Sequence, residues 1–197
     1  MRLEKKMDKI ILASNSVVRK KILESNNISC RVVPSNLDEN PVKESLINEK
    51  ASPEDISKTL AELKAKKISD KYTEETVLGA DSVIDLKGEL ISKPLNRDDA
   101  LKILIKLNGK THNLISSVCI FKNGKMIWNY TDKAALTMKK LSIDELKKYL
   151  SKIKDEALYA YNVYQIEGEG KHLFSSIEGD HNTIMGLPVK KIKEFLL

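Results

Sequence analysis

Several polar side chains interrupt apolar stretches of this sequence, and their types are those that act on phosphate groups. Asp81 stands between Val77-Leu78 and Val83-Ile84, where a buried strand would otherwise carry an apolar side chain. A carboxylate there costs several kcal/mol unless it is paired or binds a metal. The residues leave two interpretations open. Asp81 is a general base or metal ligand, or it is a structural residue satisfied by backbone amides at a strand bend near Gly79.

A second candidate is the short turn from Ser14 to Arg19, which joins an apolar segment to a helical pattern. Backbone amides and the helix dipole make the start of a helix an anion site, so a phosphate would fit there. The alternative is an ordinary helix cap by Ser16 beside a surface arginine.

Further charged residues stand beside backbone-restricting or permissive residues. Lys93 precedes a proline and could reach the same end of the sheet as Asp81, or it is a solvated loop lysine. Glu167 and Asp180 neighbour glycines, where a backbone can approach a ligand or simply turn. No metal-ligand spacing relates the three histidines, which we interpret as hydrogen-bonding or surface residues: His112, His172 and His181.

The standard catalytic motifs are missing from the sequence, which has no GxxxxGK[ST], GxSxG or HExxH and no third glycine after Gly168-Glu169-Gly170. The remaining combination of one arginine, several lysines and several carboxylates suits phosphate chemistry. Cations would neutralise a polyphosphate, carboxylates would hold a hard divalent cation such as Mg²⁺, and one carboxylate would activate water.

These residues need elements to position them, and the patterns predict alternating strands and helices. We expect a strand over 9–14, a helix from about Ser16, a strand over 29–34 and a helix over 53–71. The polar stretch 35–53 has no clear period and is interpreted as a mobile loop or loosely helical segment. The strand containing Asp81 is expected over 76–85, followed by a hairpin at Lys87-Gly88.

In the second half, Asn123-Gly124 predicts a hairpin between strands 112–122 and 125–137, which requires an antiparallel pair. The other expected elements are a helix capped by Asp98 that ends at Leu107, a helix over 142–152, a strand region over 168–179 and a helix after Pro188. The fold class is therefore α/β with a mixed sheet.

Composition favours one domain over residues 1–197, since a chain of this length buries a core without staples. Cys30 and Cys119 form no CxxC or Cys/His cluster, so we expect a reduced, cytoplasmic protein. The longest apolar runs are far below the roughly 20 residues that span a bilayer, and the N-terminal MRLEKKMDK leads into too few apolar residues for a secretory signal.

The net charge of +6 raises the alternative of a nucleic-acid binder. Acids accompany most of the lysine clusters, and aromatics, at 5%, are not interleaved with them, so we expect no stable nucleic-acid partner and no membrane partner. An exposed strand edge would allow a homodimer.

Eight short segments resemble, in order and spacing, the Maf family of nucleoside triphosphate pyrophosphatases. They are LASNSVVRKKIL (12–23), LDE (37–39), LAELKAKK (60–67), GADSVI (79–84), SKP (92–94), LNGKTH (107–112), YQIEGEG (164–170) and EGDHNTIMGLP (178–188). The resemblance covers nearly the whole chain. It implies an elongated, twisted mixed sheet with two lobes around a cleft, as in Maf and ITPase-like folds, and a role in removing non-canonical nucleotides or in arrest of septum formation.

The resemblance also implies roles for individual residues in a Mg²⁺- or Mn²⁺-dependent hydrolysis of a nucleoside triphosphate to the monophosphate and pyrophosphate. Asp81 takes the place of the proton acceptor. Phosphate-binding positions match Ser14, Ser16, Arg19, Lys64 and Lys93, and the acids near metal and water match Glu39 and Asp180.

Three positions depart from the dTTP/UTP-type members, in which the first turn reads SPRR, a threonine follows the acid and a glutamine precedes the late glycine. Here they hold Val18, Ser82 and Glu167. Glu167 is more similar to the branch that resembles 7-methyl-GTP pyrophosphatases, since a carboxylate accepts hydrogen bonds from a guanine edge. The alternative from another class is a non-enzymatic regulator of septum formation that only binds a nucleotide or a protein.

Overall fold

A seven-stranded mixed sheet runs through the computed structural model, which describes residues 10–196 except the side chains of 159–161. Residues 1–9, for which the sequence predicts no secretory signal, lie outside the described part. The strand order is β2-β1-β3-β5-β6-β7, with β4 paired to β3. Strand β1 is parallel to β2 and β3, and the other pairs are antiparallel. The strands are β1 (Ile10–Leu12), β2 (Cys30–Val32), β3 (Val77–Leu86), β4 (Glu89–Ile91), β5 (Thr111–Lys122), β6 (Lys125–Met138) and β7 (Phe174–Glu178). The expected mixed α/β sheet is confirmed.

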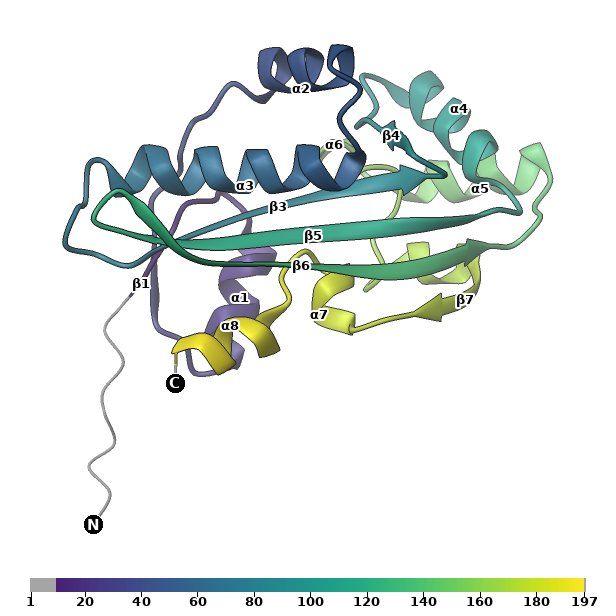
Figure 1. The fold of residues 1–197 in the computed structure, drawn as a ribbon. Coiled ribbons are helices and arrows are strands. Elements are labelled where there is room, and N and C mark those ends of the chain that lie inside the picture. The colour runs from purple at the N-terminus through teal and green to yellow at the C-terminus, as the bar shows by residue number, and fades with distance from the viewer. Residues whose placement is uncertain (1–9, 197) are drawn as a thin grey trace.

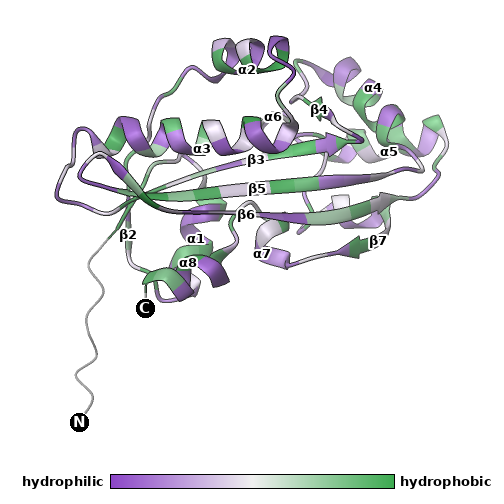
Figure 2. Cartoon of the chain, in the orientation of Figure 1, coloured by the Kyte–Doolittle hydropathy of each residue, from purple (hydrophilic) through white to green (hydrophobic). Residues whose placement is uncertain are grey.

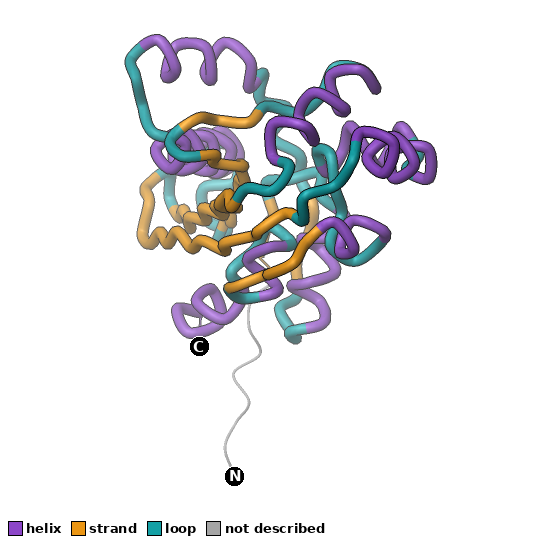
Figure 3. The backbone as a smooth tube through the Cα atoms, turned by 90° about the vertical axis from the view of Figure 1, so that its right-hand side faces the viewer, coloured by secondary structure: helices purple, strands orange, loops and turns teal. Residues whose placement is uncertain are grey.

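Helices cover both faces of this sheet (Figure 1). The long helix α3 lies along one face, α1, α7 and α8 lie on the other, and α4 and α5 stand at the far end of β3 and β5. Seen from the end of the sheet, the strands are strongly twisted between the helices (Figure 3). The helices are α1 (Val17–Ser25), α2 (Glu39–Asn48), α3 (Pro53–Ser69), α4 (Arg97–Leu107), α5 (Ile143–Lys152), α6 (Asp155–Tyr161), α7 (His181–Ile184) and α8 (Val189–Leu196), with the 3₁₀ helix η1 (Glu169–Leu173). None of these helices is long and apolar enough to cross a membrane.

The apolar core is divided by the sheet into three clusters. One lies between the sheet and α1 and α8, a second between the sheet and α3, and the third between β3–β6 and the helices α4 and α5. The long hydrophobic stretches of β3 and β5 supply all three (Figure 2). Because both faces of these strands are largely buried, their apolar residues occur in short runs rather than in strict alternation with polar ones.

The hairpin predicted at Asn123-Gly124 is confirmed. Both residues have a positive φ, 52° and 68°, as a type I′ turn requires. The turn fixes the register of β5 against β6 over the whole length of β5, apart from one irregularity near Ile120. This pair gives the sheet its elongated shape.

The polar stretch 35–53 contains a regular helix, α2, where the sequence predicts a mobile loop or a loose helix. Asp38 caps α2 by accepting a hydrogen bond from the Asn40 amide (3.3 Å). No residue of α2 is buried, so its sequence needs no apolar stripe, and the periodicity that reveals other helices is lacking.

Two other expectations need correction. Helix α4 is capped by Asn96, whose side chain accepts from the Asp99 amide (2.9 Å), so Asp98 lies in the first turn and is not the cap. The region 168–179 is a strand only from Phe174, because residues 169–173 form η1. The glycines there favour a tight turn over an extended chain.

Candidate active site

A gap in the sheet lies beside the middle of β3. Strand β1 pairs with β3 only at Val77 and Leu78, and β4 pairs with it only from Ile84. Between these points, on that side, β3 has no strand partner within residues 10–196. Because successive side chains of a strand point to opposite faces, the gap exposes groups from both faces of β3. Asp81 and Ser82 stand in this gap.

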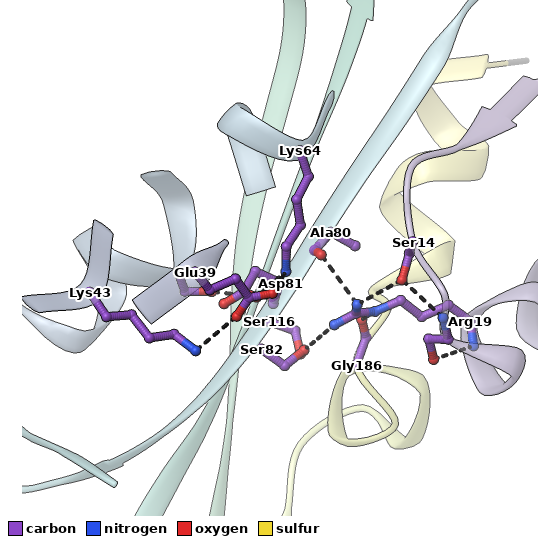
Figure 4. A network of polar contacts seen from close by, with 12 residues as sticks. Ser14, Arg19, Glu39, Lys43, Lys64, Ala80, Asp81, Ser82, Ser116 and Gly186 are labelled. Atoms are coloured by element: carbon purple, nitrogen blue, oxygen red, sulfur yellow. Dashed lines mark hydrogen bonds and ion pairs between the residues drawn. The ribbon is translucent and has the colours of Figure 1, made fainter. Parts of the chain in front are cut away.

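Asp81 belongs to a chain of alternating charges that leads from β3 to α2 (Figure 4). Lys64 Nζ of α3 lies 2.7 Å from Asp81 Oδ1 and 2.7 Å from Glu39 Oε1. Glu39 Oε2 in turn lies 2.8 Å from Lys43 Nζ. Asp81 is 6% exposed, and its second oxygen, Oδ2, is buried without a hydrogen-bond partner. The side chain is therefore paired with a cation rather than satisfied by backbone amides.

Helix α3 brings Lys64 to Asp81 because it packs directly on β3. A Cβ atom at Gly79 would lie 2.2 Å from the Ala61 carbonyl oxygen and 2.7 Å from Ala65 Cβ, so only glycine allows this approach. Gly79 and Asp81 point to the same face of the strand, and Lys64 stands beside the two alanines on α3. Ser57 of the same helix donates to the Asp81 carbonyl oxygen (3.2 Å).

On the other face of β3, Arg19 of α1 hydrogen-bonds to three other parts of the chain: the turn before α1, β3 and the segment after α7 (Figure 4). Its guanidinium donates to Ser14 Oγ (3.2 Å), the Ala80 carbonyl (3.2 Å), Ser82 Oγ (3.0 Å) and the Gly186 carbonyl (2.9 Å). Burial lowers the pKa of Arg19, and the negative charges of Asp81 and Glu39 oppose that effect. An arginine fixed in this way is a preorganised binding group for an anion.

The N-terminus of α1 opens beside this arginine. Ser16 caps the helix, since its Oγ accepts from the Arg19 amide (3.2 Å), and the Ser16 amide itself donates to Ser14 Oγ (3.2 Å). The expected cap is confirmed. The first residues of α1, Val17 and Val18, line the cavity, so the start of this helix could bind an anion there.

Charge coupling extends to Glu39 and Lys93. Burial acts to raise the pKa of Glu39, but the ammonium groups of Lys64 and Lys43 outweigh it and place the pKa at about 2. Burial lowers the pKa of Lys93; the negative charge of Glu39 acts to raise this pKa, and the positive charge of Lys43 lowers it further. Glu39 is therefore a carboxylate at every physiological pH.

A single cavity of about 600 Å³ gathers these groups. Of the residues that the sequence singles out, it is lined by Ser14, Ser16, Arg19, Glu39, Lys64, Asp81, Ser82, Lys93 and Glu167. Asp180 does not line it. Its carboxylate caps α7 by accepting from the Asn182 amide (2.9 Å) and lies 2.7 Å from Lys190 Nζ, a hydrogen bond that lowers the pKa of Asp180.

The cavity also contains residues that the sequence does not single out. Lys43 stands four positions after Glu39, a spacing typical of a helical ion pair that would have been visible had α2 been predicted. Ser116 does not line the cavity itself, but it hydrogen-bonds to Ser82 (2.9 Å) and to the Thr183 carbonyl (2.8 Å), which ties β3, β5 and α7 together. Asn162 and Tyr164 also line the cavity. No local pattern marks Ser116 or Asn162, whereas Tyr164 is the first residue of the YQIEGEG segment (164–170).

The chain is similar over nearly its whole length to proteins of one family. The family model described as Maf-like protein matches residues 9–197. A nucleoside triphosphate pyrophosphatase of Pelagibacter ubique is 71% identical over 95% of this chain and 96% of its own length. One of Ruegeria pomeroyi is 39% identical over 95% and 94%, and a 7-methyl-GTP pyrophosphatase of Bartonella quintana is 38% identical over 92% and 91%. With a match of this extent and a cavity lined by residues of its motifs, the chain belongs to the Maf-like protein family.

Proposed function

We propose that this chain hydrolyses a nucleoside triphosphate to the nucleoside monophosphate and pyrophosphate. The observation that carries the proposal is the buried, unpartnered Oδ2 of Asp81 in a cavity lined by cations from separate elements. The printed names of the relatives, nucleoside triphosphate pyrophosphatase and 7-methyl-GTP pyrophosphatase, support it.

The cations have a polyphosphate as their natural ligand. Arg19 is held by four acceptors, and the helix start at Ser16 offers backbone amides nearby. Lys64 and Lys93 reach the same cavity from α3 and from the segment after β4. Phosphoryl transfer needs positioned charge more than covalent chemistry, so these groups would hold the triphosphate in line for attack.

Asp81 would act as the general base. A water molecule attacks the α-phosphorus, its proton passes to Asp81 Oδ2, and the bond from the α-phosphorus to the bridging oxygen breaks, so that pyrophosphate leaves. Lys64, which contacts Oδ1, would keep the carboxylate oriented before the attack.

The site also fits a divalent cation. Asp81 and Glu39 converge on one positive group, Lys64 Nζ, and both offer the hard carboxylate oxygens that Mg²⁺ and Mn²⁺ prefer. Within residues 10–196 no group of three His, Cys, Asp or Glu side chains could hold a metal, which suits a cation that takes one or two carboxylates and completes its shell with phosphate and water. Such a cation, held by Glu39 beside Asp81, would neutralise charge on the phosphates.

The nucleobase would lie against the wall that the segment 162–167 contributes to the cavity. Glu167 stands in this wall with the apolar Ile166, and a carboxylate there would accept hydrogen bonds from a guanine edge. We therefore propose a modified or non-canonical purine nucleotide as the preferred substrate.

The test is a panel of canonical and modified nucleoside triphosphates, 7-methyl-GTP among them, incubated with the protein and Mg²⁺ or with chelator. Pyrophosphate and orthophosphate are measured separately. We expect one pyrophosphate per monophosphate, and loss of turnover with chelator. Release of orthophosphate, or no turnover of any nucleotide, would contradict the proposal.

A further inference from the structure

His112 is a buried histidine at the start of β5 that the proposed reaction does not use. It is 1% exposed, and its Nε2 lies 2.7 Å from Tyr164 Oη. Its Nδ1 has no hydrogen-bond partner; among the described residues it shares this condition only with Asp81 Oδ2. Phe174 packs against both rings, with centroids 5.9 Å from His112 and 4.8 Å from Tyr164. A phenylalanine would fill this apolar space without the unpaired Nδ1, which costs roughly 1–3 kcal/mol, but it would leave Tyr164 Oη without its partner.

The partner of His112 belongs to the wall of the cavity. Tyr164 lies in the segment 162–167, which joins α6 to η1 and contains no helix or strand, yet lines the cavity along most of its length. A segment without secondary structure must be positioned by side-chain contacts if it is to present a defined surface to a ligand.

Each end of this segment is fixed by a different contact. Asn162 Nδ2 lies 3.4–3.5 Å from the carbonyls of Ile91 and Ser92, next to Lys93, and Tyr149 Oη donates to the Val163 carbonyl (3.1 Å). Farther along, Gly170 packs so closely on Gln165 that a Cβ would lie 2.5 Å from its carbonyl oxygen. The His112–Tyr164 bond fixes the middle of the wall to β5, the strand that pairs with the Asp81 segment of β3.

The histidine is suited to this task because it stays neutral. Burial lowers its pKa to about 4, so at neutral pH one nitrogen carries a proton and the other does not. Two uncharged groups therefore share the hydrogen bond between Nε2 and Tyr164 Oη, in which either atom can be the donor.

We propose that His112 is a positioning residue for the nucleobase: through Tyr164 it fixes the 162–167 wall, and it thereby sets nucleoside affinity without acting on the phosphates. The proposal rests on the proposed function, since it assumes that the nucleoside contacts this wall. In this proposal the site has two parts. Charged side chains bind the phosphates, and the hydrogen bond between uncharged His112 and Tyr164 fixes the wall that contacts the nucleoside.

The test compares His112→Phe, Tyr164→Phe and the double variant with His112→Gln, whose amide can still donate to the tyrosine. We expect the first three to raise the KM for the best nucleotide to a similar extent, about tenfold, with kcat within about twofold. The inhibition constant of inorganic tripolyphosphate should stay unchanged, because it has no nucleoside. His112→Gln should restore most of the affinity.

Thr111→Val is the matched control, since it removes a hydrogen bond to Thr137 from the adjacent position of β5 and leaves the wall untouched. A merely structural role for His112 would lower kcat, or weaken tripolyphosphate and nucleotide equally, and either result would overturn the proposal, as would an unchanged KM. If the wild type releases no pyrophosphate, the proposed function fails. Dissociation constants of a nucleoside triphosphate and of tripolyphosphate, measured in chelator, then still test the role of His112.

Discussion

At the scale of single residues, the charged side chains of the site neutralise one another as ion pairs in the absence of a ligand. Lys64 and Asp81 are both about nine-tenths buried, and each would be costly alone. Glu39 gives Lys64 a second partner at 2.7 Å. The pair is therefore stable without a ligand, and one carboxylate oxygen remains available for a proton.

Asp81→Asn tests that oxygen. Asparagine keeps the shape and still accepts a hydrogen bond from Lys64, but it cannot take a proton from water. We expect kcat to fall by a hundredfold or more, equivalent to about 3 kcal/mol of transition-state stabilisation, with the far-ultraviolet circular dichroism spectrum unchanged. The check is pyrophosphate release at saturating nucleotide. Near-normal turnover by a folded variant would remove Asp81 from the role of base.

The sequence allows this residue-scale prediction only in part. The acid within an apolar strand and the Ser14–Arg19 turn are local patterns, and both are found in the cavity. The ion pair of Lys64 with Asp81 is not local, since the two residues lie on different elements. The hydrogen bond of Arg19 to the Gly186 carbonyl is not local either, because 167 positions separate the two residues in the sequence. Such contacts depend on the topology of the sheet.

At the scale of elements, the contact between α3 and β3 sets the distance between Lys64 and Asp81. Gly79→Ala would place a methyl group 2.2 Å from the Ala61 carbonyl oxygen and would push α3 away from the strand. We expect a loss of roughly 1–3 kcal/mol in the free energy of unfolding and a fall in kcat/KM that persists at temperatures where the variant is fully folded.

Gly88→Ala is the control for this prediction, since a Cβ at Gly88 has no atom within 4 Å, although the φ of 90° makes alanine strained there. It should lose stability by about 1 kcal/mol and keep its activity. Urea unfolding and initial rates measure both variants. Equal activity losses for the two glycines would mean that α3 does not position the site.

Helix α2 presents a different case, because it has no buried residue and reaches the site through Glu39 and Lys43. Lys43→Gln should raise the KM for a nucleoside triphosphate about tenfold by removing a cation from the cavity. Lys58→Gln breaks an equivalent pair with Glu54 outside the cavity and should leave KM within about twofold. The measurement is the KM of each variant from steady-state kinetics at fixed ionic strength. An equal change in KM for the two variants would mean that Lys43 does not contribute to substrate binding.

This helix also marks the limit of element prediction. Periodicity detects helices that bury an apolar stripe, as α3 and α5 do, and the hairpin is encoded in two residues. A helix whose role is to carry charge to a cavity has no such stripe. Its capping Asp38 is the local signal that the sequence does contain.

At the scale of the whole molecule, the cavity lies where β1 and β4 leave one side of the middle of β3 without a strand partner, and segments from both halves of the chain line it. Strand β5 connects the 162–167 wall with the residues proposed to bind phosphate, because its His112 hydrogen-bonds to Tyr164 and its Ser116 to Ser82. A change at one end of β5 should therefore affect global stability as well as the site, and the pH dependence of unfolding reports on it.

The sign of that dependence follows from the pKa of His112, about 4 in the folded chain against 6.5 for an unperturbed histidine. Between these values the unfolded chain binds a proton that the folded chain excludes, so stability falls as the pH is lowered from 6.5 toward 4. The pKa of Glu39 is about 2 in the folded chain against 4.5 for an unperturbed glutamate, so the stability that Glu39 contributes is lost only below pH 4.5.

Between pH 6.5 and 4.5 the change in the free energy of unfolding therefore reports on His112, whose contribution there is roughly 2–3 kcal/mol. Urea unfolding across this window should show the loss in the wild type and a flatter profile in His112→Gln, which cannot titrate; parallel profiles would mean that His112 accepts its proton without unfolding.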